Sequence, residues 1–228
     1  MNQLLQQLQS EEWTLLVSLP RNDEVLARAA LAGGAQGLKV HINVEHFASG
    51  TKFGSFEDEG ETLERIVAAA NEYSVPVGIV PGGAPFASQE EFQKLAELGI
   101  DFFDAYPSDA PGWTFEQEYL DIMLAAFHGA TRDELVALES LGMTMCEASI
   151  IHHDDYGTPL STLDLARYKS LSQIITTPFI VPSQKNLFPS DQRLLRKAGA
   201  AGVLIGAIVT GREADSIEAA TRAFREAM

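Results

Sequence analysis

The chain of 228 residues contains one cysteine, Cys146, and can therefore form no internal disulfide. No uninterrupted apolar run approaches the roughly 20 residues that a membrane-spanning helix requires. Residues 1–7 also lack the basic cluster and the apolar core of a secretory signal. From these absences we expect a cytoplasmic protein with no membrane partner.

Basic residues are scarce as well. Sixteen Lys and Arg stand against 32 Asp and Glu, which gives a formal net charge of −16. The resulting negative field repels a phosphate backbone, so nucleic acid is not an expected partner. An anionic small molecule would need a local positive focus inside this negative protein, which makes each lysine or arginine near a predicted site informative.

Several catalytic motifs are missing. The sequence has no Gly-x-Ser-x-Gly elbow, no P-loop, no Gly-x-Gly-x-x-Gly after a strand, no His-Glu-x-x-His and no Cys-x-x-Cys. These absences argue against serine hydrolases, nucleoside-triphosphate enzymes and zinc ribbons.

What the sequence does contain is a regular alternation of short apolar runs and amphipathic stretches, typical of βα units around a parallel sheet. The predicted strands are 13–19, 38–44, 75–80, 101–106, 121–127, 143–149, 178–181 and 203–206. The predicted helices are 23–32, 61–73, 89–98, 132–141, 162–174, 191–198 and 216–227. No linker divides the chain, and α/β barrels commonly take this length as one unit. We predict a single (β/α)8 TIM barrel that forms one domain over residues 1–228.

The connection between the fourth and fifth predicted strands breaks this rhythm. Residues 107–112 read Pro-Ser-Asp-Ala-Pro-Gly, and residues 115–117 leave room for little more than one helical turn. We therefore predict that the fourth helix is short or missing. If residues 118–127 were helical instead, seven strands would remain and an open doubly wound sheet would be the alternative.

The second predicted strand is unusual because its polar and aliphatic residues alternate. Lys39, His41, Asn43 and Glu45 share one parity, and aliphatic residues occupy the other. The aliphatic face should pack against helices, which turns the polar row toward the barrel lumen. An exposed edge strand would explain the same pattern, but a closed barrel has no edge.

Carboxylates lie near the ends of other predicted strands, where barrel active sites are found. Glu147 stands between Cys146 and Ala148, and a carboxylate in such surroundings needs a partner or has a raised pKa, both of which suit a general base. We predict Lys39 and Glu147 as an acid/base pair. A structural salt bridge in the lumen is the alternative. The other predicted catalytic residues are His41 and Asp104, and Ser18 and Asn43 are predicted to contact the substrate.

The last βα unit contains the most specific pattern. Residues 199–211 form a glycine-bounded apolar strand followed by a short apolar turn, and the backbone amides at Gly206 and Ala207 are predicted to bind an anion. Ser183 and Lys185 follow the seventh predicted strand and are predicted to join this site, although Lys185 could equally be a solvated loop residue.

This pattern resembles the ribulose-phosphate-binding group of (β/α)8 barrels, which includes N-acetylmannosamine-6-phosphate 2-epimerases. Residues 16–18 and 76–80 are similar to the first and third strands of the epimerase branch. The resemblance implies a small phosphorylated metabolite as the ligand. It also implies a catalytic lysine after the third strand and a glutamate after the seventh, but residues 81–83 read Pro-Gly-Gly and residues 182–184 read Pro-Ser-Gln. The catalytic pair of the family is therefore absent.

Two loops are expected at the mouth of the barrel. Residues 46–60 have the glycine and phenylalanine content of a mobile flap. Residues 152–155 read His-His-Asp-Asp, which could bind a divalent metal although the spacing matches no known motif.

The sequence thus predicts an enzyme that acts on a small phosphorylated, sugar-like substrate by proton transfer next to a carbonyl. It would be an isomerase or epimerase, or an aldolase-type lyase in which Lys39 forms a Schiff base. One alternative is a barrel that binds a phosphorylated metabolite without transforming it. Another is a divalent-metal lyase or hydrolase that uses His41, Asp104, Glu147 and the loop 152–155. The substrate and the oligomeric state stay open, and a homo-oligomer is compatible with the sequence.

Overall fold

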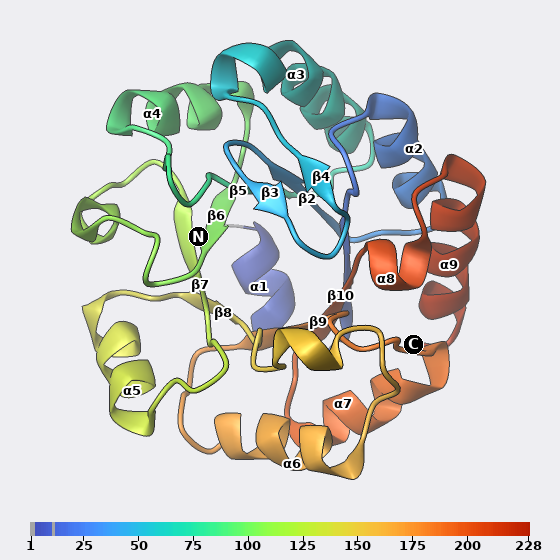
Figure 1. The fold of residues 1–228 in the computed structure, drawn as a ribbon. Coiled ribbons are helices and arrows are strands. Elements are labelled where there is room, and N and C mark those ends of the chain that lie inside the picture. Colours follow the sequence, from blue (N-terminus) through green and yellow to red (C-terminus); the bar gives the residue numbers. More distant parts are fainter. Residues whose placement is uncertain (1–2, 11) are drawn as a thin grey trace.

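The computed structural model describes residues 3–10 and 12–228, and its parallel strands close into a barrel (Figure 1). Around the barrel the order is β1-β10-β9-β8-β7-β6-β5-β2. The strands are β1 (Thr14–Ser18), β2 (Gly37–His41), β5 (Val77–Val80), β6 (Phe102–Ala105), β7 (Asp121–Ala125), β8 (Met145–Glu147), β9 (Phe179–Pro182) and β10 (Gly202–Ile205). All eight predicted strands are present. Because β7 is a strand, the doubly wound alternative is wrong and the fold is the predicted TIM barrel.

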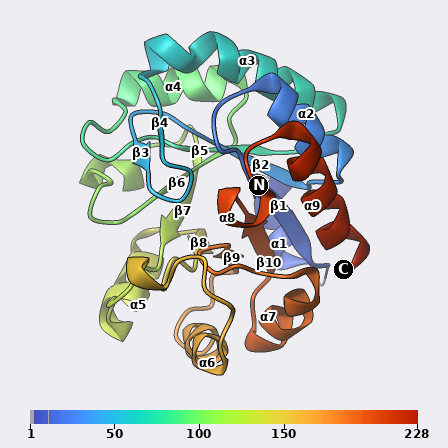
Figure 2. The ribbon, with the colours of Figure 1, turned by 45° about the vertical axis from the view of Figure 1, so that its right-hand side comes forward.

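Helices surround the barrel on its outer side (Figures 1 and 2). They are α2 (Glu24–Ala32), α3 (Phe56–Glu72), α4 (Gln89–Leu98), α5 (Arg132–Leu141), α6 (Thr162–Leu171), α7 (Gln192–Ala198) and α9 (Ala214–Glu226), with the short α8 (Ala207–Thr210) before α9. Between β6 and β7 the structure has only a 3-10 turn at Gly112–Phe115. The prediction of a short or missing fourth helix is confirmed.

The loop after β2 differs from the predicted flap. Helix α3 begins at Phe56, five residues before the predicted start, because Ser55 and Asp58 form a capping box that fixes its first turn. What remains of the flap is a small antiparallel hairpin of β3 (Glu45–His46) and β4 (Thr51–Lys52), in which Glu45 pairs with Lys52. The hairpin lies over the upper end of β2 (Figure 1).

A short helix that was not predicted, α1 (Gln3–Gln9), closes the bottom of the barrel. Figures 1 and 2 show it beneath the strands, inside the ring of helices. Its Leu4 and Leu8 join an apolar cluster in the lower lumen, whose other buried members are Leu16, Phe102, Met123, Met145, Ile180 and Leu204. Access to the lumen is therefore from the other end, where the strands terminate.

Above this apolar layer of the lower lumen, the side chains that face the lumen are polar. Side chains two residues apart share a face of a strand, so Asp104 lies above Phe102 and Glu147 lies above Met145. The apolar layer is tightly packed, since a Cβ at Gly78 would lie 2.0 Å from the ring of Phe102 and only glycine fits there.

Among the described residues, no helix has both the length and the apolar character needed to cross a membrane.

Candidate active site

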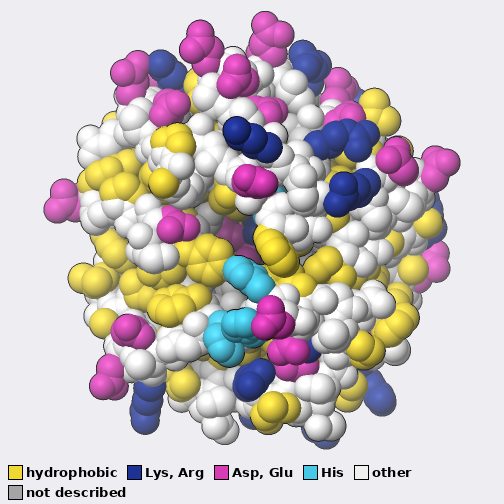
Figure 3. All heavy atoms as spheres, in the orientation of Figure 1, with side chains coloured by type: hydrophobic (Ala, Val, Ile, Leu, Met, Phe, Trp, Pro, Cys, Tyr) yellow, Lys and Arg dark blue, Asp and Glu magenta, His cyan; other side chains and the backbone are white. Residues whose placement is uncertain are grey.

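A cavity of about 300 Å³ opens at the C-terminal ends of the strands, where TIM-barrel active sites lie. Its walls come from strands on opposite sides of the barrel and from the β3–β4 hairpin. Figure 3 looks onto this mouth, which is rimmed by hydrophobic side chains and histidines.

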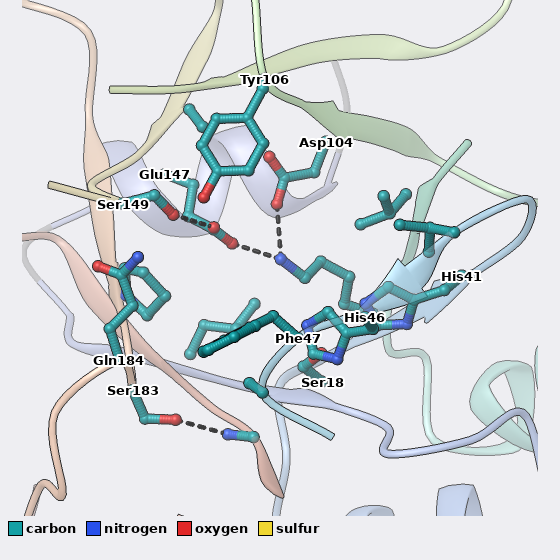
Figure 4. Close-up of a pocket in the computed structure, with 18 of the residues that line it drawn as sticks. Ser18, His41, His46, Phe47, Asp104, Tyr106, Glu147, Ser149, Ser183 and Gln184 are labelled. Atoms are coloured by element: carbon teal, nitrogen blue, oxygen red, sulfur yellow. Dashed lines mark hydrogen bonds and ion pairs between the residues drawn. The ribbon is translucent and has the colours of Figure 1, made fainter. Parts of the chain in front are cut away.

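The polar floor of the cavity is an ion-pair cluster around Lys39. Its Nζ lies 2.7 Å from Asp104 Oδ2 and also bonds Glu147 Oε2, and all three side chains are at least nine-tenths buried. The pleat of β2 points Lys39 into the lumen, where it lines the cavity. Asp104 comes from β6 and Glu147 from β8, and both side chains point into the pocket (Figure 4). The structure thus brings together three of the predicted catalytic residues.

One ammonium cannot neutralise two buried carboxylates, so the two carboxyl groups differ. Burial and the neighbouring Glu147 raise the pKa of Asp104 well above its usual range. Burial also opposes ionisation of Glu147, but the Lys39 ammonium and hydrogen bonds from Asp104, Lys39 and Ser149 hold its pKa below the ordinary value. Burial opposes the charge on Lys39 as well, yet the two acids raise the pKa of its amine. These surroundings favour an ammonium on Lys39 and a carboxylate on Glu147, and they favour the protonated form of Asp104.

A chain of hydroxyl groups positions Glu147 from above. Ser149 Oγ donates to Glu147 Oε1 over 2.6 Å. Tyr106 is hydrogen-bonded to Ser149, and Tyr156 to Tyr106. Gln184 Nε2 donates to the Tyr156 hydroxyl at 2.5 Å and so fixes the outer end. None of these four residues was a predicted site residue. Tyr106 and Ser149 are the last residues of the predicted strands 101–106 and 143–149, whereas Tyr156 and Gln184 lie in loops, where no periodicity marks them.

The predicted anion site forms a second polar corner of the cavity. The Gly206 N–H, predicted to be free, donates to Ser183 Oγ over 2.8 Å. The N–H groups of Ala207 and Ile208, which begin α8, have no acceptor among the described residues. The buried Ser18 hydroxyl beside them also has no described partner. The corner therefore offers two amides and two hydroxyls to a ligand.

Two predicted contacts lie elsewhere. Asn43 does not follow the alternation of β2, because the strand ends at His41 and Asn43 takes a left-handed φ of 55°, with its N–H bonded to the carbonyl of Gly54. Lys185 is buried away from the cavity, where its Nζ bonds Thr158 Oγ1 at 2.8 Å and lies 3.4 Å from Asp164 Oδ2. The ammonium pairs with this buried carboxylate, which belongs to the capping box of α6, and is therefore not available to an anion.

His41 lies in the cavity wall but is sealed from solvent. Its ring stacks on Phe53 and packs in a tilted arrangement against His46, each at a centroid distance of 4.6 Å. Neither ring nitrogen has a partner among the described residues. Burial keeps the pKa of His41 well below its usual range, so the ring is neutral. His46, which was not a predicted site residue, lies against His41 and lines the cavity.

The structure does not assemble the hypothetical metal site. Nowhere in residues 3–10 and 12–228 do three or more His, Cys, Asp or Glu side chains come together in a way that could hold a metal ion. His152 and Asp154 are exposed on the loop that contains the 3-10 turn His153–Asp155. His153 instead stacks on Phe47 at 4.8 Å and joins the two loops across the cavity mouth.

No family model and no curated protein matches the sequence. Among solved structures, the chain is similar to thiamine phosphate pyrophosphorylase from Pyrococcus furiosus, with 15% identity, a TM-score of 0.69 and coverage of 98% of this chain and 96% of that one. It is also similar to tryptophan synthase from M. tuberculosis, with 13% identity, a TM-score of 0.70 and coverage of 95% of this chain and 92% of that one. A third similar structure is described as native KDPGal, with 16% identity, a TM-score of 0.66 and coverage of 96% of this chain and 95% of that one. At these identities the likeness shows the fold alone. The likeness supports the barrel fold that the resemblance of residues 199–211 implied. It does not support the narrower epimerase-like group. The chain is a (β/α)8 TIM barrel, and its structural neighbours are TIM-barrel enzymes.

Proposed function

We propose that this chain is an enzyme that transfers protons at a carbon next to the carbonyl of a small phosphorylated, sugar-like substrate. The observation that carries the proposal is the Lys39 ammonium held between Asp104 and Glu147 on the floor of the cavity. A pair of carboxyl groups whose environments drive their pKa values apart is the arrangement that acid–base catalysis needs.

Each member of the cluster has a role in such a reaction. The Glu147 carboxylate takes the proton from the carbon, and the Asp104 carboxylic acid gives a proton to the oxygen or to the opposite face of the carbon. The Lys39 ammonium stabilises the negative charge that develops on the substrate oxygen. Because the three side chains are buried directly above the apolar layer of the lower lumen, these interactions are stronger than they would be in water.

The protonation state of Lys39 favours an isomerase or epimerase over a Schiff-base lyase. A Schiff base requires a neutral amine, whereas both buried acids stabilise the ammonium. We therefore expect borohydride to trap no adduct between Lys39 and a carbonyl substrate.

Hydrogen exchange tests the proposal without knowledge of the natural substrate. Dihydroxyacetone phosphate and ribulose 5-phosphate, two small phosphorylated ketones, are incubated with the protein in deuterated water, and proton NMR follows the signal next to the carbonyl. We expect enzyme-dependent loss of this signal for at least one probe. Binding of both probes without exchange would replace the proposal with a metabolite-binding barrel.

A single methyl group tests the anion corner. A Cβ at Gly206 would lie 3.5 Å from Ser18 Cβ and 3.9 Å from Ser183 Oγ, which is ordinary contact distance, and the backbone φ of −135° suits alanine. We expect Gly206→Ala to fold normally but to bind inorganic phosphate at least tenfold more weakly, about 1.4 kcal/mol, because the methyl occupies the corner.

Isothermal titration with phosphate measures this loss. Gly112→Ala is the matched control, since a Cβ at Gly112 meets nothing within 4 Å. Equal phosphate affinity in Gly206→Ala and in the unchanged protein would remove this corner from the binding site.

A further inference from the structure

His46 belongs to the cavity wall that the β3–β4 hairpin contributes. It lines the same cavity as Lys39 and Glu147, and its ring lies 4.6 Å from that of His41 at an interplanar angle of 41°. Figure 4 shows His46 beside His41, on the opposite side of the pocket from Glu147. A ligand between the two sides would contact both Glu147 and His46.

The hydrogen bond of His46 to Ser49 determines which ring nitrogen holds the proton. His46 Nδ1 lies 2.9 Å from Ser49 Oγ, and Ser49 is fully buried. If Nδ1 were the donor, the hydroxyl hydrogen of Ser49 would be buried with no acceptor among the described residues, which costs free energy. Ser49 is therefore the donor, Nδ1 is the acceptor, and the proton of the neutral ring is on Nε2.

The groups around His46 keep its ring neutral. Burial and the Lys39 ammonium lower its pKa to about 4, although the Glu147 carboxylate acts in the opposite direction. The neighbouring ring of His41, at a centroid distance of 4.6 Å, is also neutral. No described residue accepts a hydrogen bond from Nε2. The hairpin thus holds a neutral, unpartnered N–H donor at the cavity.

We infer that His46 is a further catalytic residue, whose Nε2–H donates a hydrogen bond to the carbonyl oxygen of the substrate. The inference rests on the proposed function. When Glu147 takes the proton from the carbon, the C–H electron pair forms a C=C bond and the carbonyl π pair moves onto the oxygen. His46 stabilises this oxygen without losing its own proton, and Asp104 then protonates it. Ser49 is a positioning residue that selects the tautomer.

Variants of His46 test the role in catalysis. His46→Phe keeps a ring against His41 but removes the donor, and we expect the kcat of deuterium exchange to fall about 10² to 10³-fold with little change in KM. His46→Gln keeps an N–H donor at a similar reach and should recover at least tenfold of that loss. Thermal unfolding verifies that both variants fold. Exchange by His46→Phe within threefold of the unchanged protein would overturn the inference.

A second measurement needs no turnover. In protein labelled with ¹⁵N-histidine, we expect His46 to show the neutral Nε2–H tautomer at pH 7, with no titration down to pH 5. Ser49→Ala should populate both tautomers. Addition of 2-phosphoglycolate, whose carboxylate resembles a charged carbonyl oxygen, should move the Nε2–H proton downfield.

The two measurements separate the ways in which the inference and the proposed function can fail. If no probe exchanges but 2-phosphoglycolate still shifts the His46 Nε2–H, the proposed reaction fails and the donor role survives as a binding contact. An Nδ1–H tautomer, titration near pH 6.5, or no shift with 2-phosphoglycolate would overturn the inference even if exchange occurs.

Discussion

Replacing Lys39 with methionine is expected to lower the free energy of unfolding at pH 8 by about 3 to 5 kcal/mol, the cost of removing one partner from a buried ion pair. Among the described residues, the Lys39 ammonium is the cation that pairs with Asp104 and with Glu147, and all three side chains are buried. For a chain of this length the loss corresponds to a decrease of about 6 to 20 °C in the unfolding temperature. Scanning calorimetry or circular dichroism measures it directly.

The deficit should depend on pH in a defined direction. Without the ammonium, burial raises the folded-state pKa of both carboxyl groups above their unfolded values. A group with a raised folded-state pKa takes up a proton on folding, so the stability of the variant falls as pH rises through that pKa. The deficit relative to the unchanged protein is therefore largest at pH 8 and smaller at pH 5, where protonation removes the buried charges.

The double variant Lys39→Met/Glu147→Gln is the control for this explanation. It lacks both the cation and one carboxylate, so it should recover much of the stability lost at pH 8. A deficit that is equal at pH 5 and pH 8, or that the second substitution does not reduce, would show that Lys39 stabilises the barrel by packing and not by charge.

The sequence contained enough information for the barrel and for the core of the candidate site. Periodic apolar runs marked every strand, and the alternation in β2 placed Lys39 in the lumen because strand parity follows directly from the chain. Glu147 and Asp104 could be assigned to the mouth because they lie near the ends of parallel strands.

Other features depended on contacts between distant residues. Asn43 shares the parity of Lys39, but β2 ends at His41. Asn43 then takes a left-handed φ, and its N–H bonds the carbonyl of Gly54. Lys185 is two residues from Ser183, a predicted member of the anion site, yet its ammonium forms an ion pair with Asp164 of α6. His46 had no local pattern to mark it, since its environment is made by Ser49, His41 and Lys39 together.

The capping box at Ser55 and Asp58 is a different case, because it is local and could have been identified from the sequence. This capping box predicts that α3 begins at Phe56, which limits the flap to the segment that forms the hairpin. Helix α1 is marked only by its leucines, whose burial depends on the lower lumen being open to receive them.

Separate neutralisation of the two carboxyl groups is expected to assign the base and the acid. Glu147→Gln removes the proposed base, and we expect exchange of the probe ketones to fall by about 10² to 10⁴-fold. Asp104→Asn retains an uncharged hydrogen-bonding group beside Glu147, so proton removal from carbon should persist at a higher rate than in Glu147→Gln. Both variants should fold at neutral pH, because either remaining carboxylate can pair with the one ammonium of Lys39.

The pH profile of exchange distinguishes the two roles. A base must be ionised, and the low pKa of Glu147 places the rise in activity on the acid side. An acid must be protonated, so activity in the unchanged protein should decline as pH rises through the raised pKa of Asp104. Because the carboxyl groups interact, the midpoint belongs to the pair, but Asp104→Asn should abolish the decline. If that variant retained the decline and Glu147→Gln lost it, the two roles would be reversed. If both variants exchanged the probes at the unaltered rate, the cluster would be a structural ion pair.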